Sequence, residues 1–274
     1  MKIAYQGEKG AYSEAAIYKH YRKDVETIGF ETFEDVFEAV KNGKVDYGFL
    51  PFENTISGSI AENYDLLLKE DVFVTAEVFL KISHSLLSHK GNKLDNIKKV
   101  YSHPYALHQC HEFLKKHKIK PIPEYDTAGS AKMVRERNKT EEAAIASELC
   151  AEIYDLEVLK KDIETNKNAI TKFFVFVKKD KVPKDIKKEK TSIVFKSKHY
   201  PGALVNCLQR LSKNNINMIK LESRPIMENP WEYIFYVDFI GGLDDENVKL
   251  ALSEMEAASI FVKVLGSYPE GNKS

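Results

Sequence analysis

Strand-like and helix-like patterns of apolar and polar residues alternate along the first 180 residues. The runs KIAYQ (2–6) and VDYGFL (45–50) are short and mainly apolar, as single strands are. Between them, segment 32–43 has apolar residues at spacings of three and four, which predicts an amphipathic helix: Phe33, Val36, Phe37 and Val40. Thr32 is placed to be its N-cap, and Gly43 is placed to follow its last turn.

The same alternation continues to about residue 180. It predicts strands at 98–102, 143–146 and 171–177, and helices at 12–21, 106–117, 129–137 and 147–154. Strands that alternate with helices in this way are typical of parallel α/β sheets with crossover connections.

The run Val72–His89 is rich in β-forming residues and has no helical period. A strand of this length suits a crossover between two lobes, because it can leave one sheet and reach another. We therefore expect a two-lobed α/β domain like the periplasmic binding proteins, with lobe 1 at about 1–78 and 162–180 and lobe 2 at about 79–161. A cleft between two lobes is a common place for a small ligand.

The composition changes at the lysine-rich segment 178–190, which contains Pro183 and predicts a solvated linker. Beyond it, the predicted elements follow the order strand, helix, strand, strand, helix, strand. This βαββαβ order is the ferredoxin-like arrangement. We expect one α/β domain at 1–180 and a second, ferredoxin-like domain at 190–270.

Composition and charge narrow the class of protein. Lys plus Arg and Asp plus Glu both number 41, so the net charge gives no reason to expect nucleic acid or a membrane surface as a partner. No apolar run reaches the roughly 18 residues of a membrane-spanning helix, and the N-terminal run is too short for a signal peptide. We expect a cytoplasmic protein with three reduced, mostly buried cysteines: Cys110, Cys150 and Cys207.

A polar cluster follows Pro51, which cannot donate to a sheet ladder and so ends the predicted strand. Glu53 and Asn54 come next, and Ser57 and Gly58 stand before a predicted helix. Open α/β sheets bind ligands beyond the carboxyl ends of their strands, and N–H groups at a helix start bind anions. The alternative is an ordinary N-cap with polar loop residues. A carboxylate beside anion-seeking amides favours a ligand site.

Two other strand ends carry candidate side chains. Ser102 ends a predicted strand, and Gln109 lies one turn into the helix that follows it. Thr171 and Lys172 begin a strongly apolar strand. On the residues alone, a solvated strand end is the simplest explanation of the last pair, and a role in a site follows only if this strand begins in the cleft.

Two further segments contain residues that can bind a ligand, but each also has a simpler explanation. Segment 7–14, GEKGAYSE, joins a strand to a helix but has neither the GxGxxG nor the P-loop pattern, so an ordinary turn explains it as well as an anion site. His108 and His111 lie three residues apart, but two histidines do not complete a coordination set. We expect no metal.

In combination, these segments resemble prephenate dehydratase with an attached ACT regulatory domain, over nearly the whole chain. The matching motifs are GxxGxYSE at 7–14, PxENxxxGxI at 51–60, SHPxALxQC at 102–110, TKF at 171–173, GALxxxL at 202–208, ESRP at 222–225 and VLGSYP at 264–269. The chain departs from the family pattern at Lys172, where arginine is usual, and at Ala169, where asparagine is usual. The resemblance implies a monofunctional enzyme without a chorismate mutase part.

The family converts prephenate to phenylpyruvate, carbon dioxide and water, and aromatisation of the ring drives the reaction without a cofactor. By resemblance, Thr171 would donate a hydrogen bond or a proton to the departing hydroxyl, with Glu53 as the alternative donor. Lys172 would hold a substrate carboxylate, as a point charge rather than a planar fork. The other substrate-binding residues would be Asn54, Ser57, Gly58, Ser102, Gln109 and Asp126.

The ACT part implies feedback inhibition by L-phenylalanine bound at a subunit interface, and hence a homodimer or homotetramer formed through the ACT domains. The expected effector-binding residues are Gly202, Ala203, Leu204, Val205, Asn217, Glu222 and Ser223. Two other functions stay open from the sequence. One is arogenate dehydratase, whose substrate carries an amino group in place of the keto group. The other is a two-lobed amino-acid-sensing binding protein without catalytic activity.

Overall fold

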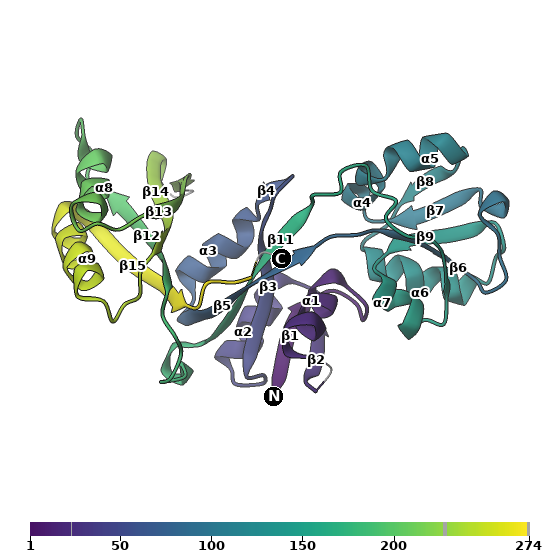
Figure 1. Cartoon of the computed structure of the whole chain (residues 1–274), viewed down its shortest axis with the longest axis horizontal. Helices are drawn as coiled ribbons and strands as arrows, with labels where there is room; N and C mark the ends of the chain where they lie inside the picture. Colours follow the sequence, from purple (N-terminus) through teal and green to yellow (C-terminus); the bar gives the residue numbers. More distant parts are fainter. Residues whose placement is uncertain (23, 227–228, 273–274) are drawn as a thin grey trace. The chain divides into compact units, whose positions relative to one another are not determined.

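The fold is described from a computed structural model, in which residues 1–22, 24–226 and 229–272 are described (Figure 1). The chain divides into two compact units. Unit 1 comprises Met1–Asn63 and Val78–Phe173, and unit 2 comprises Tyr64–Glu77 and the chain from Phe174 to Asn272. Three elements run from one unit into the other: α3 (Ala61–Lys69), β5 (Val72–Lys81) and β11 (Ile170–Lys178). The domain boundaries expected near residues 180 and 190 stay a prediction.

The first lobe of unit 1 is built on parallel strands. Its elements are β1 (Lys2–Gln6), α1 (Tyr12–Tyr21), β2 (Glu26–Phe30), α2 (Phe33–Lys41), β3 (Tyr47–Asn54) and β4 (Gly58–Ser59). Strand β1 pairs in parallel with β2 on one side and β3 on the other. The predicted caps of α2 are confirmed, because Thr32 accepts a hydrogen bond from the Asp35 N–H and Gly43 follows the C-cap with φ of 67°.

The second lobe holds a five-stranded sheet in the order β10-β6-β9-β7-β8. Its strands are β6 (Ser85–Ser88), β7 (Lys99–Ser102), β8 (Lys120–Pro123), β9 (Glu142–Ala146) and β10 (Glu157–Lys160). Its helices are η1 (Leu94–Asn96), α4 (Pro104–Gln109), α5 (His111–His117), α6 (Thr127–Arg137) and α7 (Glu148–Ile153). Figure 1 shows α4 and α5 on one side of this sheet and α6 and α7 on the other.

Neighbouring residues of one strand enter different cores of this lobe, because successive side chains point to opposite faces of a sheet. Leu86 and Val100 pack with α4 and α5, whereas Leu87 and Tyr101 pack with α6 and α7. Both faces are therefore buried, which explains the continuous apolar runs of these strands.

The structure corrects several expected elements. The run 72–89 is not one strand, because β5 ends at Lys81 and β6 begins at Ser85, in the other sheet. The helix expected at 106–117 is divided at Cys110 into α4 and α5. Strands β2, β8 and β10 were not expected. Each of them lies at the edge of its sheet and has no fully buried residue, so it lacks the apolar run by which the inner strands were predicted.

The C-terminal part has the predicted βαββαβ order. It consists of β12 (Lys190–Ser197), α8 (Ala203–Lys213), β13 (Met218–Ile226), β14 (Asn229–Ile240), α9 (Glu246–Ala258) and β15 (Ser259–Tyr268), after the short η2 (Lys179–Lys181). The four strands pair in the order β13-β14-β12-β15, and β15 also meets β5 in parallel at Gly266 and Val74. Helices α8 and α9 cover one face of the sheet.

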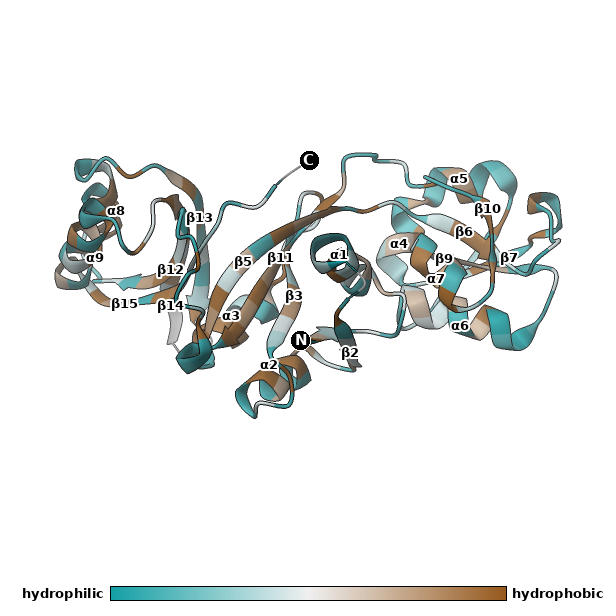
Figure 2. Cartoon of the chain, turned by 60° about the horizontal axis from the view of Figure 1, so that its bottom comes forward, coloured by the Kyte–Doolittle hydropathy of each residue, from teal (hydrophilic) through white to brown (hydrophobic). Residues whose placement is uncertain are grey.

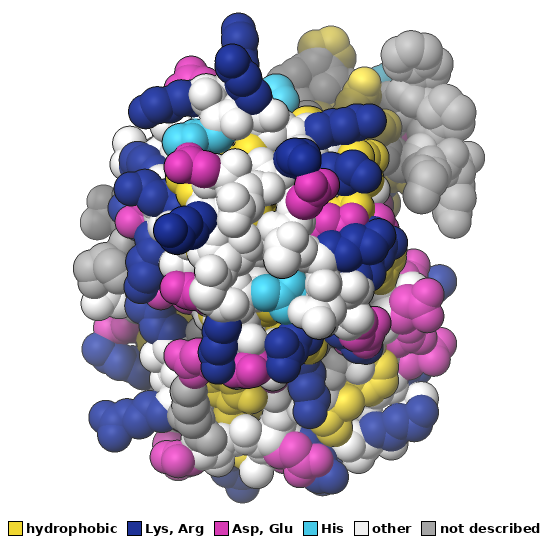
Figure 3. Space-filling model, turned by 90° about the vertical axis from the view of Figure 1, so that its right-hand side faces the viewer, with side chains coloured by type: hydrophobic (Ala, Val, Ile, Leu, Met, Phe, Trp, Pro, Cys, Tyr) yellow, Lys and Arg dark blue, Asp and Glu magenta, His cyan; other side chains and the backbone are white. Residues whose placement is uncertain are grey.

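Hydrophobic residues are concentrated in the strands of the sheets. Figure 2 shows β5 and β11 hydrophobic over most of their length, with more hydrophilic residues on the outer sides of the helices. On the face seen in Figure 3, positive and negative side chains are interspersed. Within the described residues, no helix is long and apolar enough to cross a membrane.

Candidate active site

A pocket of about 450 Å³ lies within unit 1 and draws side chains from both lobes. From the first lobe and the strands leading to it come Gln6, Gly7, Ala11, Tyr12, Ser13, Phe33, Pro51, Asn54, Ser57, Ile60, Thr171 and Phe173. From the crossover and the second lobe come Ile82, His84, His103, Tyr105, Ala106, Gln109, Tyr125, Asp126 and Thr127. The cleft expected from the sequence therefore exists, and its wall is mostly apolar with a few convergent polar groups.

The pair Asn54 and Thr171 lies in this pocket, on the neighbouring strands β3 and β11. The Asn54 Nδ2 donates to the Thr171 Oγ1 at 3.0 Å, although the residues are 117 positions apart. The Asn54 Oδ1 accepts from the N–H of Ile56 and of Ser57, and from the Tyr105 hydroxyl at 3.3 Å. These three donors fix which way the amide points.

Glu53 and Lys172 are brought together as a second pair, but they do not line the pocket. Their charged atoms lie 2.9 Å apart, with Lys172 almost buried and Glu53 partly exposed. Glu53 precedes Asn54 on β3, and Lys172 follows Thr171 on β11. Because successive side chains of a strand point to opposite faces of the sheet, the ion pair lies on the face away from the pocket pair. The structure thus separates this ion pair from Asn54 and Thr171.

The expected helix start at Ser57 and Gly58 is wrong. Gly58 and Ser59 form the short strand β4 against β3, and α3 begins only at Ala61. The N–H groups of this loop turn back onto the Asn54 Oδ1 instead of pointing to a ligand. Ser57 still lines the pocket, whereas Gly58 does not.

The second lobe contributes Gln109 and Asp126 to the pocket, but not Ser102. The Ser102 hydroxyl is fully buried and donates to the Ile145 carbonyl at 2.6 Å. Asp126 is the N-cap of α6, and burial raises the pKa of its carboxyl. Its Oδ2 has no hydrogen-bond partner among the described residues, so a protonated Asp126 could donate from this atom.

Several polar side chains of the pocket were not predicted from the sequence, among them His84 and Tyr105. His84 stands inside the apolar run 72–89, where a histidine is an available but weak signal. Its ring is buried, which lowers its pKa. The pair His108 and His111 lies elsewhere, in a separate groove beside Pro104 and Lys115, with the two rings stacked. Among the described residues, no cluster of His, Cys, Asp or Glu is suited to a metal ion.

Unit 2 contains a separate groove of about 660 Å³ between β12, α8 and the first half of β14. Four of the expected effector-binding residues line it: Gly202, Ala203, Leu204 and Val205. The other three do not. Asn217 lies before β13 and accepts from the Ile240 N–H through its carbonyl, while Glu222 and Ser223 lie within β13.

The comparisons with known proteins agree with this geometry. Residues 3–181 match the family model described as prephenate dehydratase. A relative from Arabidopsis thaliana, chloroplastic arogenate dehydratase/prephenate dehydratase 2, is 39% identical over 278 residues, which is 98% of this chain and 73% of the relative. The chain belongs to the prephenate dehydratase family. The resemblance expected from the sequence is thereby confirmed.

Solved structures of similar proteins extend over the whole chain. The prephenate dehydratase of Arthrobacter aurescens in complex with L-Phe is 27% identical, with a TM-score of 0.89 over 100% of this chain and 91% of that one. Another structure, described as a novel type of quorum quenching acylase, is 31% identical with a TM-score of 0.89, covering 98% of both chains. The prephenate dehydratase fold therefore includes the C-terminal βαββαβ part of this chain.

Proposed function

We propose that the protein converts prephenate to phenylpyruvate, carbon dioxide and water, as a step towards L-phenylalanine. The observation that carries this proposal is the contact of Asn54 with Thr171 inside a pocket of suitable size. It is supported by family membership and by a relative that is named as both an arogenate and a prephenate dehydratase.

The proton in this reaction would come from the pocket. When the ring carboxylate leaves as carbon dioxide, its electron pair enters the ring, the ring C–O bond breaks, and the departing hydroxide needs one proton to become water. The Thr171 Oγ1 already accepts from Asn54, so its own O–H is directed elsewhere and can donate to the leaving group. Because a threonine hydroxyl is a weak acid, its donation stabilises the developing negative charge, and the proton is finally replaced from solvent.

We propose a supporting role for Glu53 and Lys172. Their ion pair joins β3 and β11 on the face away from the pocket, one residue from Asn54 and Thr171 on each strand. It would hold the two strands in the register that lets the pocket pair meet. Substrate carboxylates would then be bound by uncharged donors of the pocket, including Gln109 and Ser57.

The first test is turnover of pure protein on prephenate and on arogenate, side by side, with phenylpyruvate absorbance and phenylalanine as the respective readouts. Thr171→Ala should lower kcat at least about tenfold, the value of one hydrogen bond, while Thr171→Ser, which keeps the hydroxyl, should retain most of it. A folded Thr171→Ala variant with wild-type turnover would refute the role of this hydroxyl. Turnover of arogenate alone would replace the proposed substrate with its amino analogue.

We also propose that L-phenylalanine regulates the enzyme through the groove of unit 2, since a similar structure was solved in complex with L-Phe. A groove bounded by residues such as Tyr200 and Val205, both exposed, could be completed by a second subunit, so a homodimer or homotetramer is part of the proposal. Calorimetry and light scattering with millimolar L-phenylalanine test it. Absence of heat and of inhibition, with active enzyme, contradicts it. A cytoplasmic location stays a prediction.

A further inference from the structure

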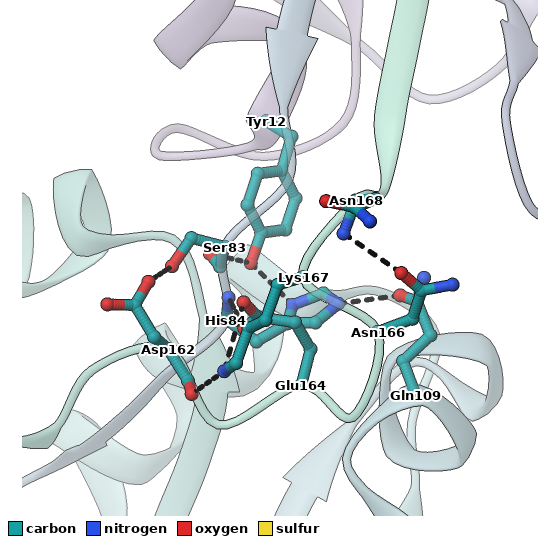
Figure 4. A network of polar contacts seen from close by, with 9 residues as sticks. All are labelled: Tyr12, Ser83, His84, Gln109, Asp162, Glu164, Asn166, Lys167 and Asn168. Atoms are coloured by element: carbon teal, nitrogen blue, oxygen red, sulfur yellow. Dashed lines mark hydrogen bonds and ion pairs between the residues drawn. The ribbon is translucent and has the colours of Figure 1, made fainter.

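His84 joins the two lobes of unit 1 through both nitrogens of its ring (Figure 4). Its Nδ1 lies 2.6 Å from the Tyr12 hydroxyl on α1, and its Nε2 lies 2.7 Å from the Gln109 Oε1 on α4. All three side chains line the pocket. Neither the family motifs nor the proposed chemistry gives His84 a role.

The backbone at His84 is held firmly in place. Its N–H donates to the buried Glu164 Oε2 at 2.8 Å, and its carbonyl accepts from the Ile163 N–H. Glu164 in turn pairs with Lys167 at 3.4 Å. Figure 4 shows Glu164 and Lys167 beside the segment that carries the ring. The ring position is therefore fixed by contacts that do not depend on a ligand.

Two arrangements of protons satisfy the contacts of a neutral His84 ring. In the first, Tyr12 donates to Nδ1, and the Nε2–H donates to the Gln109 Oε1. In the second, Tyr12 donates to the Ser83 carbonyl at 3.1 Å, the Nδ1–H donates to the Tyr12 oxygen, and Nε2 accepts from a Gln109 amide turned by 180°. The two arrangements differ in what Gln109 presents to the pocket.

The first arrangement leaves the Gln109 NH₂ group for the substrate, whereas the second leaves its carbonyl oxygen. The structure has the Gln109 oxygen on the histidine, as the first arrangement requires. The 2.6 Å contact between Tyr12 and Nδ1 holds a proton in both arrangements, and the first arrangement gives this proton to the phenol, the stronger acid of the two groups. A substrate with two carboxylates needs donors, and an amide oxygen facing it would repel it.

We infer that His84 is a positioning residue that, as the Nε2–H tautomer set by Tyr12, holds Gln109 with its NH₂ group towards a substrate carboxylate. This inference rests on the proposed function only for the identity of the carboxylate. The tautomer and the direction of Gln109 are properties of the protein without substrate.

The first experiment reads the tautomer directly, by ¹⁵N NMR of histidine side chains in the wild-type protein. The expected result is a pyrrole-like Nε2 and a pyridine-like Nδ1 for His84, assigned by the loss of these signals in His84→Gln. Tyr12→Phe should change the Nδ1 signal. A protonated Nδ1 in the wild-type protein overturns the inference, whatever the protein's substrate is.

The second experiment asks whether His84 acts through Gln109. His84→Phe should lower kcat/KM on prephenate about tenfold, the value of one hydrogen bond. His84→Gln, whose amide can replace the Nε2–H donor, should recover most of this loss. In a Gln109→Ala background, His84→Phe should cost less than about threefold, because the group it positions is already gone. Equal losses in both backgrounds overturn the inference.

A control variant separates positioning from general damage to a buried histidine. His89 is also buried in the second lobe, where its Nε2 donates to the Val134 carbonyl, but it does not line the pocket. His89→Gln should keep wild-type kcat/KM. If the wild-type protein does not act on prephenate, the proposed function fails, and the NMR result alone decides the inference about His84.

Discussion

The ion pair between Glu77 and Lys190 gives the sharpest stability prediction. The Lys190 Nζ lies 2.6 Å from the Glu77 Oε2, and the two side chains are 4% and 0% exposed. The other carboxylate oxygen of Glu77 accepts from the Gly271 N–H at 3.0 Å. The pair joins β5, β12 and the C-terminal segment within unit 2.

Replacing Lys190 with methionine leaves the Glu77 carboxylate buried with one backbone donor. Removing one partner of a buried pair typically costs about 3–5 kcal/mol, because the remaining charge is no longer compensated. We therefore expect Lys190→Met to lower the free energy of unfolding by about this amount. Glu77→Gln in the same chain should restore much of it, since no uncompensated charge then remains.

Urea unfolding followed by circular dichroism measures the effect. The matched control is Lys188→Met, the same substitution at a lysine that pairs with the largely exposed Asp244 at 2.8 Å. An exposed pair contributes about 0–1 kcal/mol. If Lys190→Met costs no more than Lys188→Met, burial does not determine the strength of this interaction, and the reasoning is refuted.

Three further predictions concern single residues. Lys172→Arg should keep turnover, because a guanidinium can also pair with Glu53, and inactive but folded enzyme would show a specific need for lysine. Gly10→Ala should lower the free energy of unfolding by about 1–3 kcal/mol, since φ is +90° and the new Cβ would lie 2.6 Å from the Cys150 Sγ; an unchanged urea midpoint contradicts this. Burial raises the pKa of the Asp126 carboxyl, so the folded state binds this proton more tightly than the unfolded state does. The free energy of unfolding should therefore fall as pH rises above the ordinary pKa range of an aspartate. Asp126→Asn should remove this pH dependence, and urea unfolding at several pH values measures it.

The sequence predicts an element correctly where its hydrophobic period and its capping residues indicate the same boundaries. Helix α2 has its apolar stripe, its N-cap at Thr32 and its glycine at 43, and all three lie where the pattern predicts them. The βαββαβ order after the lysine-rich segment is confirmed as well. The strands β2, β8 and β10 were missed because they lie at sheet edges and have no fully buried residue, so their sequences lack the apolar run of an inner strand.

The family motifs also predicted both members of the pocket pair, Asn54 and Thr171. Alternation along a strand places Glu53 and Lys172 on the opposite face, but it could not decide which of the two pairs faces the pocket. Side chains alternate along a strand, so the register of β3 against β11 decides which residues meet in the pocket. That register is set by contacts between segments more than 100 residues apart.

Motifs and periodicity were therefore enough to predict the family, the order of the longer elements and several of the polar residues of the pocket. Tertiary structure alone decided which of them share a surface, placing Ser102 in the core and His84 beside Gln109. The physical reason is that a sequence motif or a hydrophobic period describes only a few neighbouring residues. The direction of a side chain and the partner of a buried polar group depend on packing between distant parts of the chain.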